Sequence, residues 1–236
     1  MSYDELLKLV QSRRSTRRFM PAPIPDGYID KIIEVARWAP SGFNLQPWEF
    51  FVVKDPQLKA SIVQFCRDGM GNMGKLEAVR ESWQGVMKPP TPPANAPGGD
   101  YSVAPVFILL FGDTRTNIGL PMYRRFDETL TREAFKGGLA SAFLYMHLAT
   151  TSLGLGSQWV SAVTTPYAHG MIKNLLGIPL ELEVYDMMAL GYPAVPPAPR
   201  PLRETTEMVH YDKGGDTVRT DEQVKSFIRR IRTGGG

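Results

Sequence analysis

The chain has 236 residues, of which 43% are hydrophobic, and this is enough apolar material for one sizeable core in a single domain. Its 27 Lys and Arg against 24 Asp and Glu give a net charge of +3, which by itself does not indicate nucleic-acid binding. The single cysteine, Cys66, excludes an intrachain disulfide and a cysteine metal cluster.

The sequence shows neither a signal peptide nor an apolar segment long enough to cross a membrane. The first residues contain no basic segment followed by an apolar one, as a signal peptide would. The longest apolar run, residues 103–111, is too short to span a bilayer. We therefore expect a cytoplasmic protein without a membrane partner.

Hydrophobic periodicity and turn residues define the expected elements. In chain order these are a helix at 3–10, a stiff proline-rich connector at 21–25, a helix capped by Asp26 that runs to about 39, a strand at 49–54, a helix at 57–66, a strand at 103–111, a long apolar helix at 131–153, a strand at 158–163, a helix at 167–176 and a strand at 183–192. Strands and helices alternate, but not in strict strand–helix–strand units, so the predicted class is α+β.

Two segments fall outside this pattern. Residues 67–101 are rich in Gly and Pro, and we expect no regular element there except a short helix at 75–86. Such long segments in compact domains often cover binding sites, so we interpret this one as a lid over the substrate. Residues 194–236 begin with a proline-rich stretch and continue as a polar extension, which we expect to wrap over the partner subunit.

A dense basic cluster follows the first helix. Residues 12–19 contain Arg13, Arg14, Arg17 and Arg18, with hydroxyl side chains between them. Arginine keeps its charge and can donate to two phosphate oxygens at once, so a phosphate dianion is the ligand that suits this cluster. From spacing alone, a solvated basic helix end is the stronger interpretation.

Conventional catalytic motifs are missing. His147, His169 and His210 do not have metal-ligand spacing, so we expect no metal site. His147 lies on the long apolar helix and is interpreted as a core or interface residue. Residues 69–74 match Gly-x-Gly-x-x-Gly, but they follow an expected helix rather than a strand, so this match does not indicate a dinucleotide site.

Four segments taken together resemble the FMN-dependent nitroreductase superfamily, and the resemblance covers roughly the whole chain. They are Arg-Arg-Ser-Thr-Arg at 13–17, Ala-Pro-Ser-Gly-Phe-Asn-Leu-Gln-Pro-Trp at 39–48, Gly-Leu-Gly at 154–156 and Leu-Gly-Tyr-Pro at 190–193. The resemblance implies an α/β sandwich whose central mixed or antiparallel sheet is flanked by helices. It also implies a homodimer with FMN at two sites, each built from both chains.

The resemblance assigns cofactor contacts residue by residue. The segment that holds the phosphate, ribityl chain and pyrimidine edge corresponds to Arg13, Arg14, Ser15 and Arg17. Arg200 corresponds to a late basic residue that reaches the phosphate, and Arg203 is a competing candidate. The loop that approaches the flavin from the partner subunit corresponds to Pro40, Ser41 and Asn44.

The segment Val163-Thr164-Thr165-Pro166 resembles the iodotyrosine-deiodinase-like branch in particular. In that branch the last threonine donates a hydrogen bond to the flavin N5, which assigns Thr165 a catalytic role and places Val163 and Thr164 at the cofactor. A hydroxyl at N5 favours single-electron steps, whereas a backbone amide alone is associated with hydride transfer. The competing interpretation is an ordinary turn before Pro166.

The lid departs from that branch. Deiodinases clamp the amino-acid end of their substrate with a Glu, a Tyr and a Lys, but this lid has no tyrosine before Tyr101. Arg80, Trp83 and Lys88 suit a planar aromatic acid through stacking and an ion pair, although lid side chains can equally be scaffolding.

These observations favour an FMN-dependent oxidoreductase in which NAD(P)H reduces the flavin and a small aromatic acceptor is then reduced by ping-pong transfer. The acceptor is a nitroaromatic, a quinone or a haloaromatic. The alternatives are a reductive dehalogenase of the deiodinase type and a flavin-binding protein without turnover. No nucleic-acid partner is expected, since only the arginine cluster would support one.

Overall fold

The computed structural model describes residues 2–78, 100–196, 202–214 and 218–233. The chain divides into a larger compact unit, Met1–Arg80 with Gly98–Pro196, and a smaller one, Glu81–Pro97 with Pro197–Gly236. The expectation that residues 1–236 form one domain stays a prediction.

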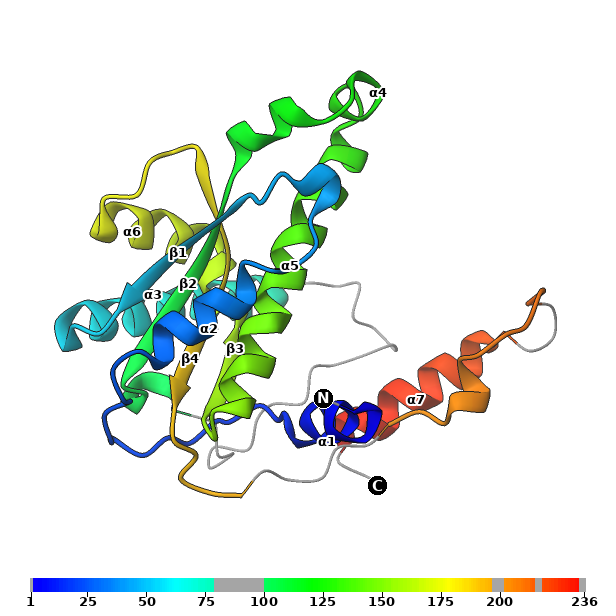
Figure 1. Cartoon of the computed structure of the whole chain (residues 1–236), viewed down its shortest axis with the longest axis horizontal. Coiled ribbons are helices and arrows are strands. Elements are labelled where there is room, and N and C mark those ends of the chain that lie inside the picture. The colour runs from blue at the N-terminus through cyan, green and yellow to red at the C-terminus, as the bar shows by residue number, and fades with distance from the viewer. Residues whose placement is uncertain (1, 79–99, 197–201, 215–217, 234–236) are drawn as a thin grey trace. The chain divides into compact units, whose positions relative to one another are not determined.

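A four-stranded antiparallel sheet with strand order β1-β2-β4-β3 forms the centre of the larger unit (Figure 1). The strands are β1 (Trp48–Val53), β2 (Val106–Asp113), β3 (Gly156–Val160) and β4 (Leu182–Gly191). Alternate residues of β2 enter two different hydrophobic clusters, with Phe107, Leu109 and Phe111 in one and Val106, Ile108 and Leu110 in the other. Since successive side chains of a strand point to opposite faces, both faces of this sheet are covered.

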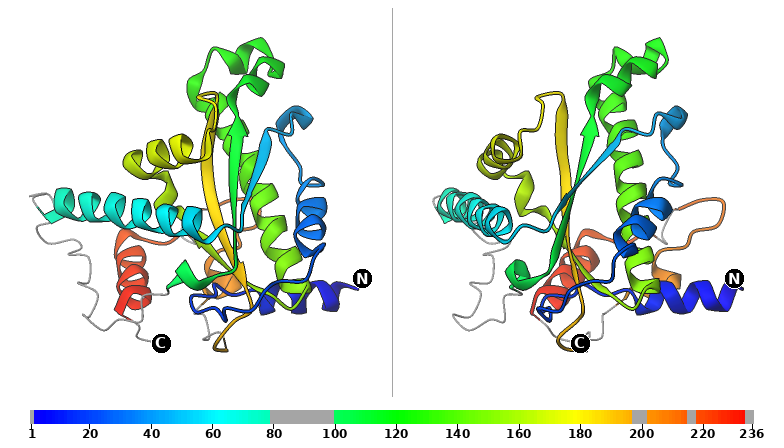
Figure 2. Two further views of the ribbon diagram at one scale, coloured as in Figure 1. Left: turned by 90° about the vertical axis from the view of Figure 1, so that its left-hand side faces the viewer. Right: turned by 60° about the vertical axis from the view of Figure 1, so that its left-hand side comes forward.

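Four helices provide the cover. α3 (Pro56–Ala78) and α6 (Pro166–Leu176) contribute to the cluster of Phe107, whereas α2 (Tyr28–Ala36) and α5 (Glu128–Ser152) contribute to the cluster of Ile108. Figure 2 shows α3 and α6 on one side of the sheet and α2 and α5 on the other. The predicted α+β class, with a central sheet flanked by helices, is confirmed, and all the strand pairs are antiparallel.

Short elements complete the larger unit. They are α1 (Tyr3–Ser12), η1 (Gly42–Asn44), η3 (Tyr101–Val103), η4 (Thr114–Gly119), α4 (Met122–Arg125) and η5 (Ser161–Thr164), where η denotes a 3-10 helix. α1 begins with a capping box in which the Ser2 side chain accepts the Glu5 N–H and the Glu5 side chain accepts the Ser2 N–H. No helix in the described part of the chain is both long and apolar enough to cross a bilayer.

Two expected boundaries were wrong. Asp26 does not cap α2, because the N-cap position is occupied by Gly27 in the left-handed region with φ 78°. The strand expected at 158–163 ends at Val160, and η5 replaces its last residues. The Thr164 hydroxyl donates to the carbonyl of Ser161 at 2.8 Å, so local side-chain bonding stabilises the turn in place of a strand.

The first part of the expected lid is helical from its start, whereas the sequence analysis expected a helix there only at 75–86. α3 continues through residues 67–78 instead of ending at residue 66. These residues include glycines but no proline, and glycine weakens a helix without removing any of its hydrogen bonds. Residues 79–99, which hold most of the rest of the lid predicted at 67–101, lie outside the described residues.

The smaller unit contains η6 (Thr205–Glu207) and α7 (Asp221–Thr233), and α7 was not expected from the sequence. Val224, Phe227 and Ile228 form its half-buried apolar side. The guanidinium groups of Arg219 and Arg230 lie 5.4 and 5.5 Å from the Phe227 ring centre. Because most residues of this segment are polar, the sequence analysis did not recognise that its three apolar positions share one face of a helix.

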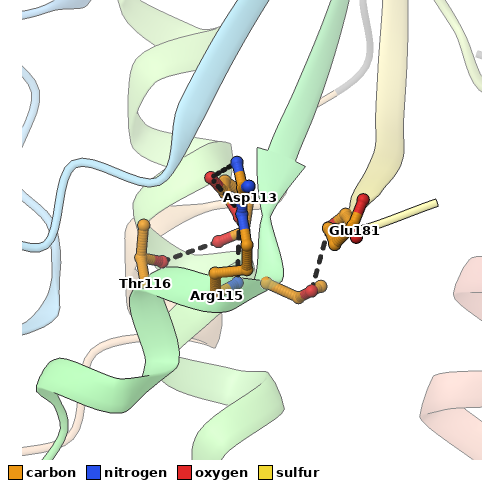
Figure 3. A network of polar contacts seen from close by, with 5 residues as sticks. Asp113, Arg115, Thr116 and Glu181 are labelled. Atoms are coloured by element: carbon orange, nitrogen blue, oxygen red, sulfur yellow. Dashed lines mark hydrogen bonds and ion pairs between the residues drawn. The ribbon is translucent and has the colours of Figure 1, made fainter. Parts of the chain in front are cut away.

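A polar network ends β2 and starts η4 (Figure 3). The Asp113 carboxylate accepts the Arg115 N–H at 2.9 Å and pairs with the Arg115 guanidinium at 2.7 Å. Thr116 donates to the Asp113 carbonyl at 2.7 Å, and the Thr114 hydroxyl donates to the Glu181 carbonyl at 2.8 Å. The hydrogen bonds from Arg115 lower the pKa of Asp113, so the ionised carboxylate stabilises this corner of the fold.

Replacing Asp113 by Ala should lower the free energy of unfolding by about 1 kcal/mol, because a capping acceptor is lost. The pKa of Asp113 is lowered in the folded state. Its contribution is therefore present above the unfolded pKa of about 3.9, and the difference between wild type and variant should shrink as the pH falls below that value. Urea unfolding at several pH values measures this. Asp26→Ala is the control and should change stability by less than about 0.5 kcal/mol; an equal loss in both variants would contradict the assignment.

Candidate functional site

The basic segment runs beside the first residues of β3. The Thr16 N–H donates to the Ser157 carbonyl at 2.9 Å, and Ser15 forms a parallel bridge with Ser157. Gly156 makes this approach possible, since a Cβ there would lie 2.3 Å from the Thr16 hydroxyl oxygen. The segment that carries Arg13 to Arg17 is therefore fixed to the outer edge of the sheet.

The side chains of this segment differ in exposure. Arg13 and Arg14 are half-buried, whereas Ser15 and Arg17 are exposed. The Arg14 guanidinium donates to the carbonyl of Gln11 and, at 3.1 Å, to that of Arg13, so it caps the C-terminal end of α1. The structure thus places four predicted cofactor residues on one short extended segment at the edge of β3.

A buried histidine supports this segment from inside. The Nδ1 atom of His147 lies 2.7 Å from the Ser157 hydroxyl, and both residues are buried. Burial, and secondarily the charge of Arg13, lower the pKa of His147 to about 4, so the imidazole is neutral near pH 7. His147 is a core residue, as we interpreted it, and the described residues contain no group of three metal-ligating side chains.

The predicted N5 segment follows β3 directly. Val163 is buried, Thr164 is exposed and Thr165 is half-buried. The Thr165 hydroxyl donates to the Ala162 carbonyl at 3.0 Å. It also faces Gly69 of α3, where a Cβ would lie 2.2 Å from the hydroxyl oxygen. Thr165 therefore occupies a space that the adjacent glycine leaves open.

The loop with Pro40, Ser41 and Asn44 lies elsewhere. Its Ser41 side chain packs against Gly138 of α5, where a Cβ would lie 3.0 Å from the Ser41 Cβ. The Ser41 hydroxyl also accepts the Gln46 N–H at 3.0 Å. Phe43, Asn44 and Gln46 have φ values of 55°, 55° and 47°, an uncommon conformation that surrounding structure must impose.

Within one chain, this loop and the basic segment pack against different parts of α5. The loop packs on Gly138 and the basic segment is supported through His147, nine positions later, which corresponds to about 14 Å of helix. Figure 1 shows α1 near the last turns of α5 and the turn before β1 near its first turns. The structure therefore places Arg13–Arg17 beside the start of β3 and Thr164 and Thr165 after its end, whereas the loop of Pro40, Ser41 and Asn44 lies against another part of α5.

Other predicted residues cannot be placed. Arg80, Trp83, Lys88 and Arg200 lie outside the described residues. Arg203, the competing phosphate candidate, belongs to the smaller unit, where its guanidinium donates to the Glu207 carbonyl and its Nε lies 3.8 Å from the Glu207 carboxylate.

Sequence reasoning missed Ser157 and Gly69. Ser157 follows the Gly-Leu-Gly segment that contributed to the resemblance, and a small hydroxyl residue there was a usable signal. Gly69 belongs to the discarded Gly-x-Gly-x-x-Gly match, which lies within α3 and so does not form a phosphate loop.

Substitution of Gly69 by Ala should displace Thr165 and lower the free energy of unfolding by about 1–3 kcal/mol, because the added methyl group overlaps the hydroxyl. Gly71→Ala on the same helix is the matched control, since a Cβ there meets no atom within 4 Å. That change should raise stability by up to about 1 kcal/mol through helix propensity. Urea unfolding of both variants measures the contrast, and similar effects would show that Gly69 does not accommodate Thr165.

Comparison with known proteins is consistent with this architecture. The iodotyrosine deiodinase of Drosophila melanogaster is 30% identical over 193 residues, which is 80% of this chain; the chain spans 62% of the length of that relative. An NADH dehydrogenase of Thermus thermophilus is 27% identical, over 77% of this chain and 83% of that protein. A crystal structure of an oxidised iodotyrosine deiodinase bound to FMN and 3-iodo-L-tyrosine matches with a TM-score of 0.64 and 26% identity, over 88% of this chain and 99% of that one.

The family described as the Nitroreductase family matches residues 10–192, which include β1 to β4, the basic segment and η5. This match takes in most of the chain and the whole of the sheet. The chain is a member of the Nitroreductase family.

Proposed function

We propose that the protein is an FMN-dependent oxidoreductase. The observation that carries the proposal is the fixed position of the arginine segment along β3, with Thr164 and Thr165 directly after that strand. Guanidinium groups and a serine hydroxyl suit a phosphate-bearing cofactor, and a threonine hydroxyl can form a hydrogen bond to a ring nitrogen. The donor set therefore fits FMN.

Each residue has a stated task in this proposal. Arg13 and Arg17, together with Arg200 or Arg203, neutralise the phosphate, and Ser15 donates to the polar part of the cofactor. Arg14, which caps α1 here, contributes positive charge at the same place. Val163 and Thr164 line the cofactor, and the Thr165 hydroxyl, which donates to the Ala162 carbonyl here, turns to donate to the N5 atom when FMN is bound. When bound, FMN supplies the electron chemistry, taking reducing equivalents from NAD(P)H and passing them to an acceptor.

We also propose that the active protein is a homodimer that places Pro40, Ser41 and Asn44 of one chain at the cofactor of the other. The separation of this loop from the basic segment within one chain supports the proposal. α5 offers a surface for the partner, because Gly137, Ser141 and Leu144 lie at helical spacing and Leu144 is 46% exposed. In a dimer whose two-fold axis passes through the middle of this row of residues, the two α5 helices would pack antiparallel. The loop on Gly138 of one chain would then lie near the basic segment of the other.

The acceptor in this proposal is a small aromatic molecule, either a nitroaromatic, a quinone or a haloaromatic. Arg80, Trp83 and Lys88 remain the proposed contacts for it. A relative named NADH dehydrogenase supports a nicotinamide donor. The second candidate is reductive dehalogenation, which the Thr165 hydroxyl and the likeness to iodotyrosine deiodinases favour.

Absorption spectroscopy of the purified protein tests the cofactor. We expect two long-wavelength flavin bands, and heating should release free FMN. NADH or NADPH should bleach these bands without oxygen, and a nitroaromatic or quinone should restore them. Bands that no nicotinamide bleaches would favour a flavin-binding protein without turnover. A colourless protein that does not take up added FMN would contradict the proposed function.

Anaerobic dithionite titration tests Thr165. In wild type we expect a transient absorption band at wavelengths longer than those of oxidised FMN, which appears midway through the titration and then disappears. In Thr165→Ala the maximum height of this band should fall at least about threefold, which is the effect of losing one weak hydrogen bond. Thr164→Ala is the matched control, because its hydroxyl donates to the Ser161 carbonyl in the same turn. An unchanged titration for Thr165→Ala would show that this hydroxyl does not act on N5.

Sedimentation velocity tests the dimer. Leu144→Glu places a charge on the proposed interface and should convert dimer to monomer while lowering FMN affinity by more than about tenfold. Leu180→Glu is the control, since Leu180 is 88% exposed before β4 and its substitution should leave the dimer intact. A wild-type protein that sediments as a monomer with FMN bound would contradict the shared site.

A further inference from the structure

A cavity of about 410 Å³ lies within the smaller unit, between η6 and α7. Figure 1 shows the segment that carries η6, in orange, beside α7, in red. Both walls belong to this unit, so the cavity forms whether or not the extension lies on a partner subunit. None of the described residues that line it is among those proposed at the cofactor or at the dimer interface.

Arg219 is the distinctive residue of this cavity. It is half-buried, and its Nη1 atom is buried without a hydrogen bond to any described residue. Its guanidinium lies 5.4 Å from the Phe227 ring centre, and this contact holds the planar group without using its N–H donors. A buried charged donor without an acceptor is costly. The Nη1 atom therefore indicates an acceptor that is still to bind in the cavity.

Arg230 brings a second positive charge to the same place. Its guanidinium lies 5.5 Å from the Phe227 ring centre, so the two cations share one aromatic neighbour. Among the described lining residues the only carboxylate is that of Glu207, and the Nε atom of Arg203 lies 3.8 Å from it. Even without Arg203, two guanidinium groups face one carboxylate. The cavity therefore carries an excess of positive charge.

Neutral donors complete the lining. Thr206 and Ser226 contribute hydroxyl groups. The Gln223 Oε1 atom accepts the Thr220 N–H at 2.8 Å, and the Thr220 hydroxyl accepts the Gln223 N–H at 3.4 Å. This pair caps the start of α7 and fixes the orientation of the amide, so the NH₂ group of Gln223 is the end left to donate.

The acidic residues at the start of α7 do not offset this charge from within the cavity. Asp221 and Glu222 are not lining residues, and Glu222 pairs with Lys225 at 3.1 Å. The positive charge is therefore local to the cavity and is not a general property of this helix.

A phosphate group suits this set of donors. It carries up to two negative charges and several acceptor oxygens, and one guanidinium can donate to two of these oxygens at once. A carboxylate has one charge and two oxygens, so it would leave more of the donors unpaired. The volume leaves room for a small organic group attached to the phosphate.

We propose that this cavity binds the phosphate group of a small molecule, with the Nη1 atom of Arg219 and the guanidinium of Arg230 donating to its oxygens. The site goes beyond the proposed oxidoreductase function and does not depend on the flavin assignment.

Calorimetric titration of the full chain with glycerol 3-phosphate tests the proposal. The protein is saturated with FMN in a phosphate-free buffer, which keeps the probe from the cofactor's own phosphate position, and the probe has no ring that could stack on a flavin. Glycerol 3-phosphate should bind saturably and at least about tenfold more tightly than acetate, because phosphate offers more charge and more acceptors. Glycerol should not bind. Absence of binding, or equal binding of glycerol 3-phosphate and acetate, would overturn the proposal.

Inorganic phosphate distinguishes two sources of the ligand. It should compete with glycerol 3-phosphate for one site. Tighter binding of glycerol 3-phosphate would identify a phosphate ester as the ligand, whereas equal affinities would identify the phosphate group alone, and both support the site. Independent binding of the two probes would contradict it.

Variants of the two arginines locate the phosphate. Arg219→Gln should weaken glycerol 3-phosphate at least about tenfold, because a charge-assisted hydrogen bond is lost. Arg219→Lys keeps the charge but not the planar pair of donors, and it should weaken binding at least about threefold. Arg230→Gln changes an exposed side chain and should also cost at least about threefold, which keeps the proposal testable if Arg219 is needed for folding.

Two matched controls separate this contact from general charge and from the flavin. Arg229→Gln removes the same charge from an exposed position of α7 outside the cavity and should weaken binding less than about threefold. Arg13→Gln should leave the affinity for glycerol 3-phosphate unchanged, and Arg219→Gln should leave the flavin bands unchanged, so either proposal can fail without the other. Equal losses for Arg219→Gln and Arg229→Gln would show a diffuse charge effect and overturn the assigned contact.

Discussion

The double-sided burial of β2 is the constraint on which the larger unit depends. Its side chains from Val106 to Phe111 are all buried, and alternate ones enter different clusters. Such a strand is stable only if helices cover both faces of the sheet, which α2 and α5 do on one side and α3 and α6 on the other. Most of the polar side chains described above lie at or beside the edge strand β3 and the segments at its two ends, including the buried His147, Ser157 and Asp186.

β3 consequently links the two polar regions of the molecule. Ser157 and Trp159 are two residues apart, so their side chains lie on the same face of the strand. Ser157 contacts His147 and accepts the N–H of the basic segment, whereas Trp159 donates to Asp186 of β4. The rings of His147 and Trp159 stack, with centroids 5.5 Å apart, and so form a continuous wall behind both regions.

The short length of β3 matters as much as its position. Because it ends at Val160, η5 can turn and present Thr164 and Thr165, while part of β4 is left without a neighbouring strand. The remaining predicted contacts, on the loop of Ser41, lie against another part of α5, which is the physical reason for expecting a second chain.

Much of this protein was determined by sequence alone. Local periodicity identified the four strands and most helices, and the order of short motifs indicated the family, because hydrophobic spacing and turn chemistry act over a few residues. Errors arose where local signals were ambiguous, as at Asp26 and in the glycine-containing second half of α3. Only the tertiary structure decided that Gly69 faces Thr165, that His147 supports Ser157 and that Asp186 accepts the indole N–H of Trp159. These features depend on which elements are neighbours in the fold and on the residue at which a strand ends. A short stretch of sequence does not determine them, because the contacts join residues far apart in the chain.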